Sequence, residues 1–301
     1  MLSLVGGRAG AHVHPEGDNR MEWTTTRGTE VPPLGQGTWR FGEDAAQRSR
    51  EVDALRAGIE AGLTLIDTAE AYAEGRSEEI VRDAVADCRD QVFLTTKVWP
   101  SHAGRAAVLS SLDQSLKRLG TDWVDLYLLH WPSSQTPLAE TMAGLVDALD
   151  RGLARHIGVS NFPAALLEEA HRLTGGRVFA NQVRYGLATR EPETTLAAVA
   201  ARLDTSLMAY SPIRHVLGPD TAVNDVLADV AHEHGVSPAA VALAWIMRPA
   251  AAQWVVVVKA ANRAHLADNA AALRLALSAT DLDRLDRAFP ASGEDLHLQT
   301  F

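Results

Sequence analysis

Short apolar runs alternate with amphipathic stretches along most of the chain. The runs are dominated by Val, Leu and Ile, a composition typical of strands that are covered on both faces of a parallel sheet. The eight runs that we predict to be strands are Leu34–Trp39, Leu63–Ile66, Val92–Thr96, Val124–Leu129, His156–Val159, Val178–Asn181, Ser206–Ala209 and Trp254–Val258.

The stretches between these runs have the apolar spacing of helices. In SREVDALRAGIEAG, Val52, Leu55 and Ile59 fall on one stripe, and Gly62 ends the predicted helix. Further on, Ser237-Pro238 combines an N-cap residue with a first-turn proline. The other predicted helices are Ser77–Ala86, Arg105–Leu119, Leu138–Arg151, Pro163–Leu173, Pro192–Leu203, Thr221–His234 and Pro238–Met247.

This strand–helix alternation predicts an α/β fold, a (β/α)8 TIM barrel, with a doubly wound open sheet as the alternative. No linker rich in Pro or Gly divides the chain, so we expect one domain over residues 21–301. The turn at Arg27-Gly28 predicts an N-terminal β-hairpin, which we expect to close the barrel bottom. Residues 1–20 are polar and Gly-rich, and we expect them to be disordered.

Composition narrows the classes of function. The chain has 301 residues and a formal net charge of −10, from 28 basic and 38 acidic residues, which argues against a nucleic-acid partner. One cysteine, Cys88, excludes an internal disulfide and a multi-cysteine metal site. The sequence has neither a membrane-length apolar run nor a signal-peptide core, so we expect a cytoplasmic protein with no membrane partner. With no long apolar stretch that demands a partner, we expect a monomer.

Two common motifs can be set aside. The segment from Gly35 to Arg40, GQGTWR, begins like the G-x-G-x-x-G dinucleotide fingerprint but lacks its third glycine. The chain also has two H-x-H pairs, one in the N-terminal extension and one on a predicted helix, where residues i and i+2 do not face each other. We therefore expect no metal site at His12, His14, His232 or His234.

Four candidate catalytic residues follow three successive predicted strands: Asp67, Tyr72, Lys97 and His130. Each alone has an ordinary structural explanation, but active sites of such barrels lie at the carboxyl ends of the strands, where all four fall. A lysine ammonium beside the tyrosine would lower the phenol pKa, and the aspartate would hold the lysine. Histidine could then orient a carbonyl oxygen. This set would protonate an oxyanion as a hydride arrives.

From about residue 24 to residue 290 the chain resembles the aldo-keto reductases. The matching stretches, in family order, are VPPLGQGTW, GLTLIDTAEAYAEG, FLTTKVWP, DLYLLHWP, HIGVSNFP, FANQVRYG and MAYSPI. The resemblance implies an NADPH-dependent oxidoreductase that reduces aldehydes or ketones to alcohols by direct hydride transfer. It places the catalytic tetrad on Asp67, Tyr72, Lys97 and His130, with Tyr72 as the general acid.

The resemblance also implies cofactor-binding residues. Ser160, Asn161 and Gln182 match the positions that hydrogen-bond the nicotinamide carboxamide, and Tyr210 matches the tyrosine that stacks on the ring. Ser211 and Pro212 match the start of the loop that covers the pyrophosphate. Asp268 and Asn269 match the pair of residues that contacts the adenine end of the cofactor.

The phosphate-binding segment after the last strand departs from the family pattern. Lys259 and Asn262 match, but Ala260 replaces a serine and His265 an arginine, which leaves Arg263 as a candidate replacement. Losing a bidentate arginine weakens discrimination for a phosphate. We expect NADPH as the cofactor, with NADH or dual use as the alternative.

Trp39, Trp99 and Trp131 each follow a strand and match substrate-pocket positions of the family, although tryptophan more often packs in cores or interfaces. Two other functions stay open. One is a redox-sensing or regulatory subunit that binds the cofactor with little turnover. Such a subunit would not need the four residues of the tetrad. The other is a Schiff-base lyase that uses Lys97, which would need a desolvated lysine without a carboxylate partner.

Overall fold

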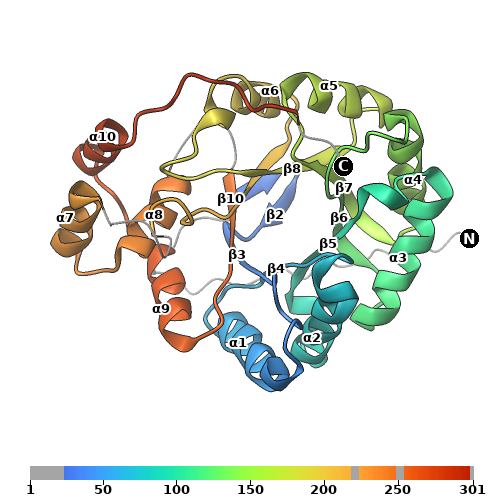
Figure 1. Ribbon diagram of the computed structural model, residues 1–301, viewed down its shortest axis with the longest axis horizontal. Helices are drawn as coiled ribbons and strands as arrows, with labels where there is room; N and C mark the ends of the chain where they lie inside the picture. Colours follow the sequence, from blue (N-terminus) through green and yellow to red (C-terminus); the bar gives the residue numbers. More distant parts are fainter. Residues whose placement is uncertain (1–23, 218–223, 249–253, 299–301) are drawn as a thin grey trace, which may run out of the picture.

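Eight parallel strands close into a barrel in the computed structural model, which describes residues 24–217, 224–248 and 254–298 (Figure 1). The order around the barrel follows the chain, and the last strand pairs with both its predecessor and the first, which closes the ring. The strands are β3 (Leu34–Gly37), β4 (Leu65–Asp67), β5 (Phe93–Val98), β6 (Val124–Leu129), β7 (Ala154–Ser160), β8 (Val178–Arg184), β9 (Ser206–Tyr210) and β10 (Trp254–Val258).

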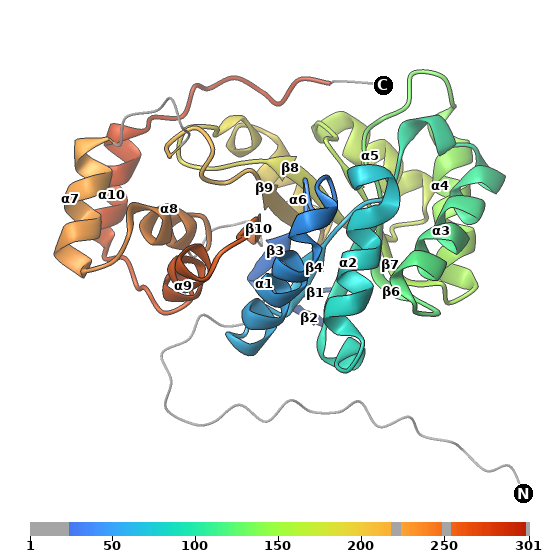
Figure 2. The ribbon, with the colours of Figure 1, turned by 60° about the horizontal axis from the view of Figure 1, so that its bottom comes forward.

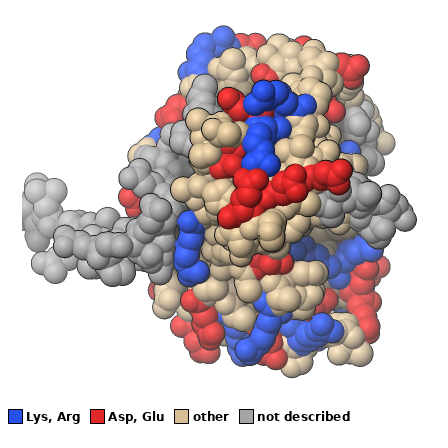
Figure 3. Space-filling model, turned by 90° about the vertical axis from the view of Figure 1, so that its left-hand side faces the viewer, with Lys and Arg blue, Asp and Glu red and all other residues tan. Residues whose placement is uncertain are grey.

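Helices surround this barrel and shield its outer face. α7 and α10 lie outside the ring, beyond α8, and Figure 3 shows their side of the molecule, where acidic and basic side chains lie next to each other. The helices are α1 (Arg48–Glu60), α2 (Arg76–Val85), α3 (Arg105–Leu119), α4 (Leu138–Asp150), α5 (Ala164–Leu173), α6 (Leu196–Arg202), α7 (Asp225–His234), α8 (Pro238–Ile246), α9 (Arg263–Ala272) and α10 (Ala279–Ala288).

The strands are apolar on both faces because each face meets a different core. Leu126, Leu128, Phe179 and Met208 belong to a cluster inside the barrel, and a larger cluster fills the layer between strands and helices. Every residue of β6 and β10 is buried. Since all the strands run in the same direction, the residues that follow them converge on one rim.

A hairpin of β1 (Thr24–Thr26) and β2 (Thr29–Val31) closes the opposite end, as predicted (Figure 2). Its two turn residues, Arg27 and Gly28, both have positive φ, as a two-residue hairpin loop requires. The Arg27 guanidinium donates to the main-chain oxygens of residues 203 and 204, just before β9. The hairpin is thereby fixed to the bottom of the barrel.

The predicted elements agree with the structure except on the carboxyl-terminal side. The predicted helix Pro192–Leu203 is interrupted: a 3-10 turn at Glu191–Glu193 precedes α6, because Thr195 has non-helical dihedral angles. The helices α9 and α10 have no counterpart in the prediction. Residues 1–20 and the start of the predicted helix Thr221–His234 lie outside the described residues. Within the described residues, no helix has both the length and the apolar character needed to cross a membrane.

Candidate active site

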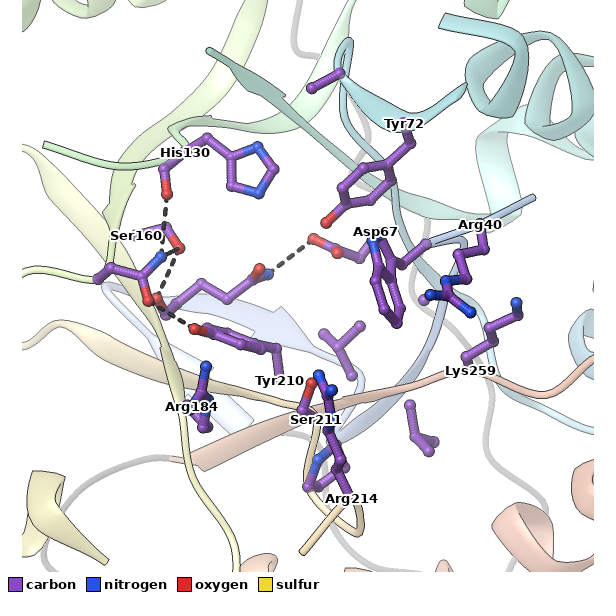
Figure 4. Close-up of a pocket in the computed structure, with 18 of the residues that line it drawn as sticks. Arg40, Asp67, Tyr72, His130, Ser160, Arg184, Tyr210, Ser211, Arg214 and Lys259 are labelled. Atoms are coloured by element: carbon purple, nitrogen blue, oxygen red, sulfur yellow. Dashed lines mark hydrogen bonds between the residues drawn. The ribbon is translucent and has the colours of Figure 1, made fainter. Parts of the chain in front are cut away.

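A cavity of about 670 Å³ opens at the carboxyl ends of the strands (Figure 4). Residues at or just after the ends of all eight barrel strands line it, as the alternation predicted. The residues that line it are Gly37, Trp39, Arg40, Asp67, Ala71, Tyr72, Trp99, His130, Trp131, Ser160, Asn161, Gln182, Arg184, Tyr210, Ser211, Pro212, Ile213, Arg214, Val257, Val258 and Lys259.

Lys97 lies beneath this cavity and is completely buried. Its ammonium nitrogen lies 2.7 Å from Oδ2 of Asp67, 2.9 Å from the carbonyl oxygen of Thr68 and 3.4 Å from the hydroxyl of Tyr72. An ammonium group has three N–H bonds, so these three acceptors satisfy it. The third donor points to Tyr72, whose hydroxyl is therefore fixed at the cavity wall.

Burial and pairing set the charges of this group. Burial raises the pKa of Tyr72 above its ordinary value, and the nearby charge of Lys97 only partly opposes this. The lowering effect of Lys97 that the sequence predicted is present, but desolvation of the phenolate outweighs it, so the pKa of Tyr72 is raised overall. For Lys97, burial disfavours the charge, but Asp67 and Tyr72 outweigh it and raise the pKa. Tyr72 is thus protonated and Lys97 charged at neutral pH.

His130 stands on the opposite side of the phenol. Its ring centroid lies 5.6 Å from that of Tyr72 and 5.2 Å from the nearest ring of Trp99, both in edge-to-face geometry. Burial, together with the charge of Lys97, holds the pKa of His130 well below its ordinary value. The imidazole is neutral at pH 7 and can donate one hydrogen bond to an oxygen in the cavity.

Three polar side chains, those of Ser160, Asn161 and Tyr210, form a hydrogen-bonded group with the main chain of Gln182 at the ends of β7, β8 and β9. The amide of Asn161 donates to the carbonyl oxygen of His130 at 3.1 Å and to Oγ of Ser160 at 3.0 Å, and it accepts from the Tyr210 hydroxyl at 2.9 Å. Oγ of Ser160 and the main-chain N–H of Asn161 both donate to the carbonyl oxygen of Gln182, at 2.8 Å. These contacts hold the predicted carboxamide-binding residues on one wall (Figure 4).

Cationic side chains line the rest of the cavity: Arg40, Arg184, Arg214 and Lys259. Burial lowers the pKa of Lys259 and the nearby charge of Arg40 adds to this effect, although Glu51 opposes it. Sequence reasoning identified Lys259 and missed the three arginines. Each of them lies within four residues of a predicted site residue, and that proximity was the available signal.

The remaining predicted residues are divided between the cavity and its surroundings. All three tryptophans line the cavity, and Trp39 is 48% exposed, so it forms part of the mouth. Four predicted cofactor residues lie on the segment that follows β10, away from the lining. Asn262 caps α9 by accepting from the main-chain N–H of His265, Arg263 is exposed, Asp268 is half-buried and Asn269 is buried.

Comparisons with known proteins agree on one family. Residues 33–289 match the model of the Aldo/keto reductase family. Methylglyoxal reductase YeaE of Escherichia coli (strain K12) is 44% identical over 265 residues, which cover 87% of this chain and 92% of that protein. Methylglyoxal reductase DkgB of Yersinia pestis is 30% identical over 275 residues, which cover 87% and 97%.

Solved structures give the same result. An aldo/keto reductase from Klebsiella pneumoniae in complex with NADP and acetate superimposes with a TM-score of 0.85 at 38% identity, over 95% of this chain and 100% of that one. A second structure, of an aldo-keto reductase from Klebsiella pneumoniae in complex with NADPH, has a TM-score of 0.85 at 39% identity, over 93% and 99%.

Proposed function

The chain belongs to the aldo/keto reductase family, and we propose that it is an NADPH-dependent reductase that converts aldehydes or ketones to alcohols with Tyr72 as general acid. The observation that carries this proposal is the buried Asp67–Lys97 pair, which meets the Tyr72 hydroxyl at the cavity wall. A redox-sensing subunit would not need this arrangement. A Schiff-base lyase is disfavoured because the pKa of Lys97 is raised and its three N–H bonds have acceptors.

In the proposed reaction, a substrate carbonyl oxygen lies between the Tyr72 hydroxyl and the imidazole of His130. When bound, NADPH supplies the hydride to the carbonyl carbon. Tyr72 gives its proton to the oxygen as negative charge develops there, and Lys97 stabilises the phenolate that remains. Neutral His130 donates a hydrogen bond that orients the oxygen without taking over the role of acid.

The cavity wall suits a dinucleotide. Ser160, Asn161 and Gln182 offer amide and hydroxyl groups for a carboxamide, and the half-buried ring of Tyr210 can stack on the nicotinamide. His130 Nδ1 is buried with no hydrogen-bond partner in the described part of the chain. The four cationic side chains can neutralise phosphates, with Ser211 and Pro212 beginning the covering loop. We further propose that Lys259, Asn262, Arg263, Asp268 and Asn269 hold the adenosine end, by resemblance to the family.

Small aldehydes and dicarbonyl compounds are the proposed substrates, because the relatives named above are methylglyoxal reductases and three tryptophans form an apolar mouth. We also propose that residues 21–301 form one domain and that the protein is a monomer in the cytoplasm. Size-exclusion chromatography with light scattering tests the oligomeric state.

Two measurements test the function. Cofactor oxidation is followed at 340 nm with a panel of aldehydes, dicarbonyl compounds and aromatic ketones, and turnover that needs NADPH is expected. Stoichiometric NADPH binding without turnover on any carbonyl would instead favour the sensor. Fluorescence titration with NADPH and NADH side by side then measures the cofactor preference that Ala260 and His265 leave open.

A further inference from the structure

The carboxylate of Asp67 has a second partner on the far side of the barrel. Its Oδ2 accepts from Lys97, while its Oδ1 accepts from Nε2 of Gln182 at 2.8 Å. Gln182 belongs to β8 and Asp67 to β4, on opposite sides of the ring of strands, so the bond crosses the barrel interior. It is the dashed line that ends at Asp67 in Figure 4. Asp67 and Gln182 line the cavity but are only 3% and 2% exposed, so this contact is largely shielded from water.

Gln182 is held in place from its main chain. Its carbonyl oxygen accepts from Oγ of Ser160 and from the main-chain N–H of Asn161, both at 2.8 Å, in register with β7. Because Nε2 points to Asp67, the amide has a fixed orientation. Its carbonyl oxygen Oε1 is then the atom that can accept from a carboxamide N–H in the cavity.

We propose that Gln182 is a positioning residue that couples the cofactor wall to the proton donor, by holding the Asp67 carboxylate and so setting how much of the Lys97 charge reaches Tyr72. The hydrogen bond joins two parts of the site with different functions. Gln182 belongs to the wall that binds the carboxamide, and Asp67 belongs to the group that delivers the proton. This inference rests on the proposed function for its kinetic consequence only.

The physical argument concerns one carboxylate shared between two donors. A hydrogen bond from Gln182 stabilises charge on Oδ1, so less negative charge is concentrated on the oxygen that faces Lys97. Without that donor, the carboxylate attracts the ammonium more strongly and Tyr72 loses part of its stabilising cation. The pKa of Tyr72 should then rise, and the phenol should become a weaker acid.

Among residues 24–217, 224–248 and 254–298, the charged or titratable groups that act on Tyr72 are Lys97 on β5, Asp67 on β4 and Tyr210 on β9. The neutral ring of His130, after β6, lies beside them. The Gln182 side chain donates to Asp67, and Asp67 in turn pairs with the lysine that meets the phenol, so the main effect of removing this amide on Tyr72 is expected through Asp67 and Lys97.

The experiment compares Gln182→Met with Gln36→Met. Gln36 is a matched control because it is a buried glutamine on β3 whose Nε2 donates to two main-chain carbonyls, away from the tetrad. The phenolate of Tyr72 is titrated by absorbance at 295 nm, as the difference between each protein and the same protein carrying Tyr72→Phe. The alkaline limb of kcat is measured at saturating NADPH.

Gln182→Met is expected to move the Tyr72 midpoint and the kcat limb upward by about 0.5 pH unit or more, while Gln36→Met moves neither. An unchanged midpoint, or an equal shift in both variants, would overturn the inference, even if the Kd for NADPH increases. Gln182→Leu serves if the methionine variant does not fold. The titration needs no turnover, so an inactive wild type contradicts the proposed function and leaves this measurement valid.

Discussion

The ammonium nitrogen of Lys97 lies 2.7 Å from the carboxylate of Asp67, and the two side chains are 0% and 5% exposed. A buried pair of this kind gains Coulomb energy that mainly offsets the cost of removing two charges from water. Removing one partner leaves the other charged and buried, which is far more costly than removing both. The pair therefore contributes to Tyr72 chemistry more than to the stability of the barrel.

We predict that Lys97→Met lowers the free energy of unfolding by about 3–5 kcal/mol, because the Asp67 carboxylate loses its counter-ion. The double variant Asp67→Leu/Lys97→Met should recover most of this loss without recovering turnover. Urea unfolding and cofactor oxidation measure the two properties. A double variant as unstable as the single one would show that the pair does stabilise the fold.

A second prediction concerns the loop after β9. A Cβ atom at Gly186 would lie 2.2 Å from the carbonyl oxygen of Pro212, which belongs to the cavity wall. Gly186→Ala should therefore displace this loop, cost about 1–3 kcal/mol of stability and weaken NADPH binding several-fold. At Gly104 the added Cβ meets nothing within 4 Å, so Gly104→Ala is the control. Unchanged NADPH affinity in Gly186→Ala would mean that the loop adapts.

Acid sensitivity is expected at the barrel bottom. His156 stacks on Phe179 with ring centroids 4.0 Å apart, and burial lowers its pKa to about 4. The unfolded chain binds this proton near pH 6.5, so the contribution to stability is complete above that pH and is lost as the pH falls toward 4.

The slope for this one group is at most about 1.4 kcal/mol per pH unit. His156→Phe should reduce the pH dependence of unfolding in this window, whereas His232→Gln, at an exposed position on α7, should not. Denaturant unfolding between pH 4 and pH 7 checks this. Identical slopes for wild type and His156→Phe would refute the assigned role.

The next prediction distinguishes a direct contact between Lys259 and a cofactor phosphate from the effect of the protein's overall charge on cofactor binding. Lys259 lines the cavity, whereas the exposed Arg274 lies outside its lining. Lys259→Met should raise the Kd for NADPH by more than the Kd for NADH, because a lysine here is expected to meet the 2′-phosphate. Arg274→Met makes the same change of charge and should alter neither Kd. Equal losses for both cofactors would place Lys259 at the pyrophosphate alone.

The sequence predicted the barrel, and the meeting of Asp67, Tyr72, Lys97 and His130 at one end of it, because both depend on local order along the chain. Asp67, Lys97 and His130 each lie at or directly after a strand, and parallel strands bring their ends to one rim. The contact between Gln182 and Asp67 joins positions 115 residues apart, and no pattern marks it.

Net pKa directions were also out of reach. The sequence indicates that a lysine lies near Tyr72, but the depth of burial, which decides the sign, comes only from the packed structure. The arginines of the cavity are a similar case. Their closeness in the chain to predicted site residues was a signal, but only the structure shows that Arg184, at the end of β8, and Arg214, after β9, both line the cavity.

The central claim is that Tyr72 gives the proton during carbonyl reduction. Tyr72→Phe keeps the ring beside His130 and removes only the hydroxyl near Lys97. The most direct test measures NADPH oxidation at 340 nm for this variant and the wild type, with NADPH binding followed by fluorescence. We predict a fall in kcat of about 10²- to 10⁴-fold with little change in the Kd for NADPH. Undiminished turnover in Tyr72→Phe would contradict the mechanism.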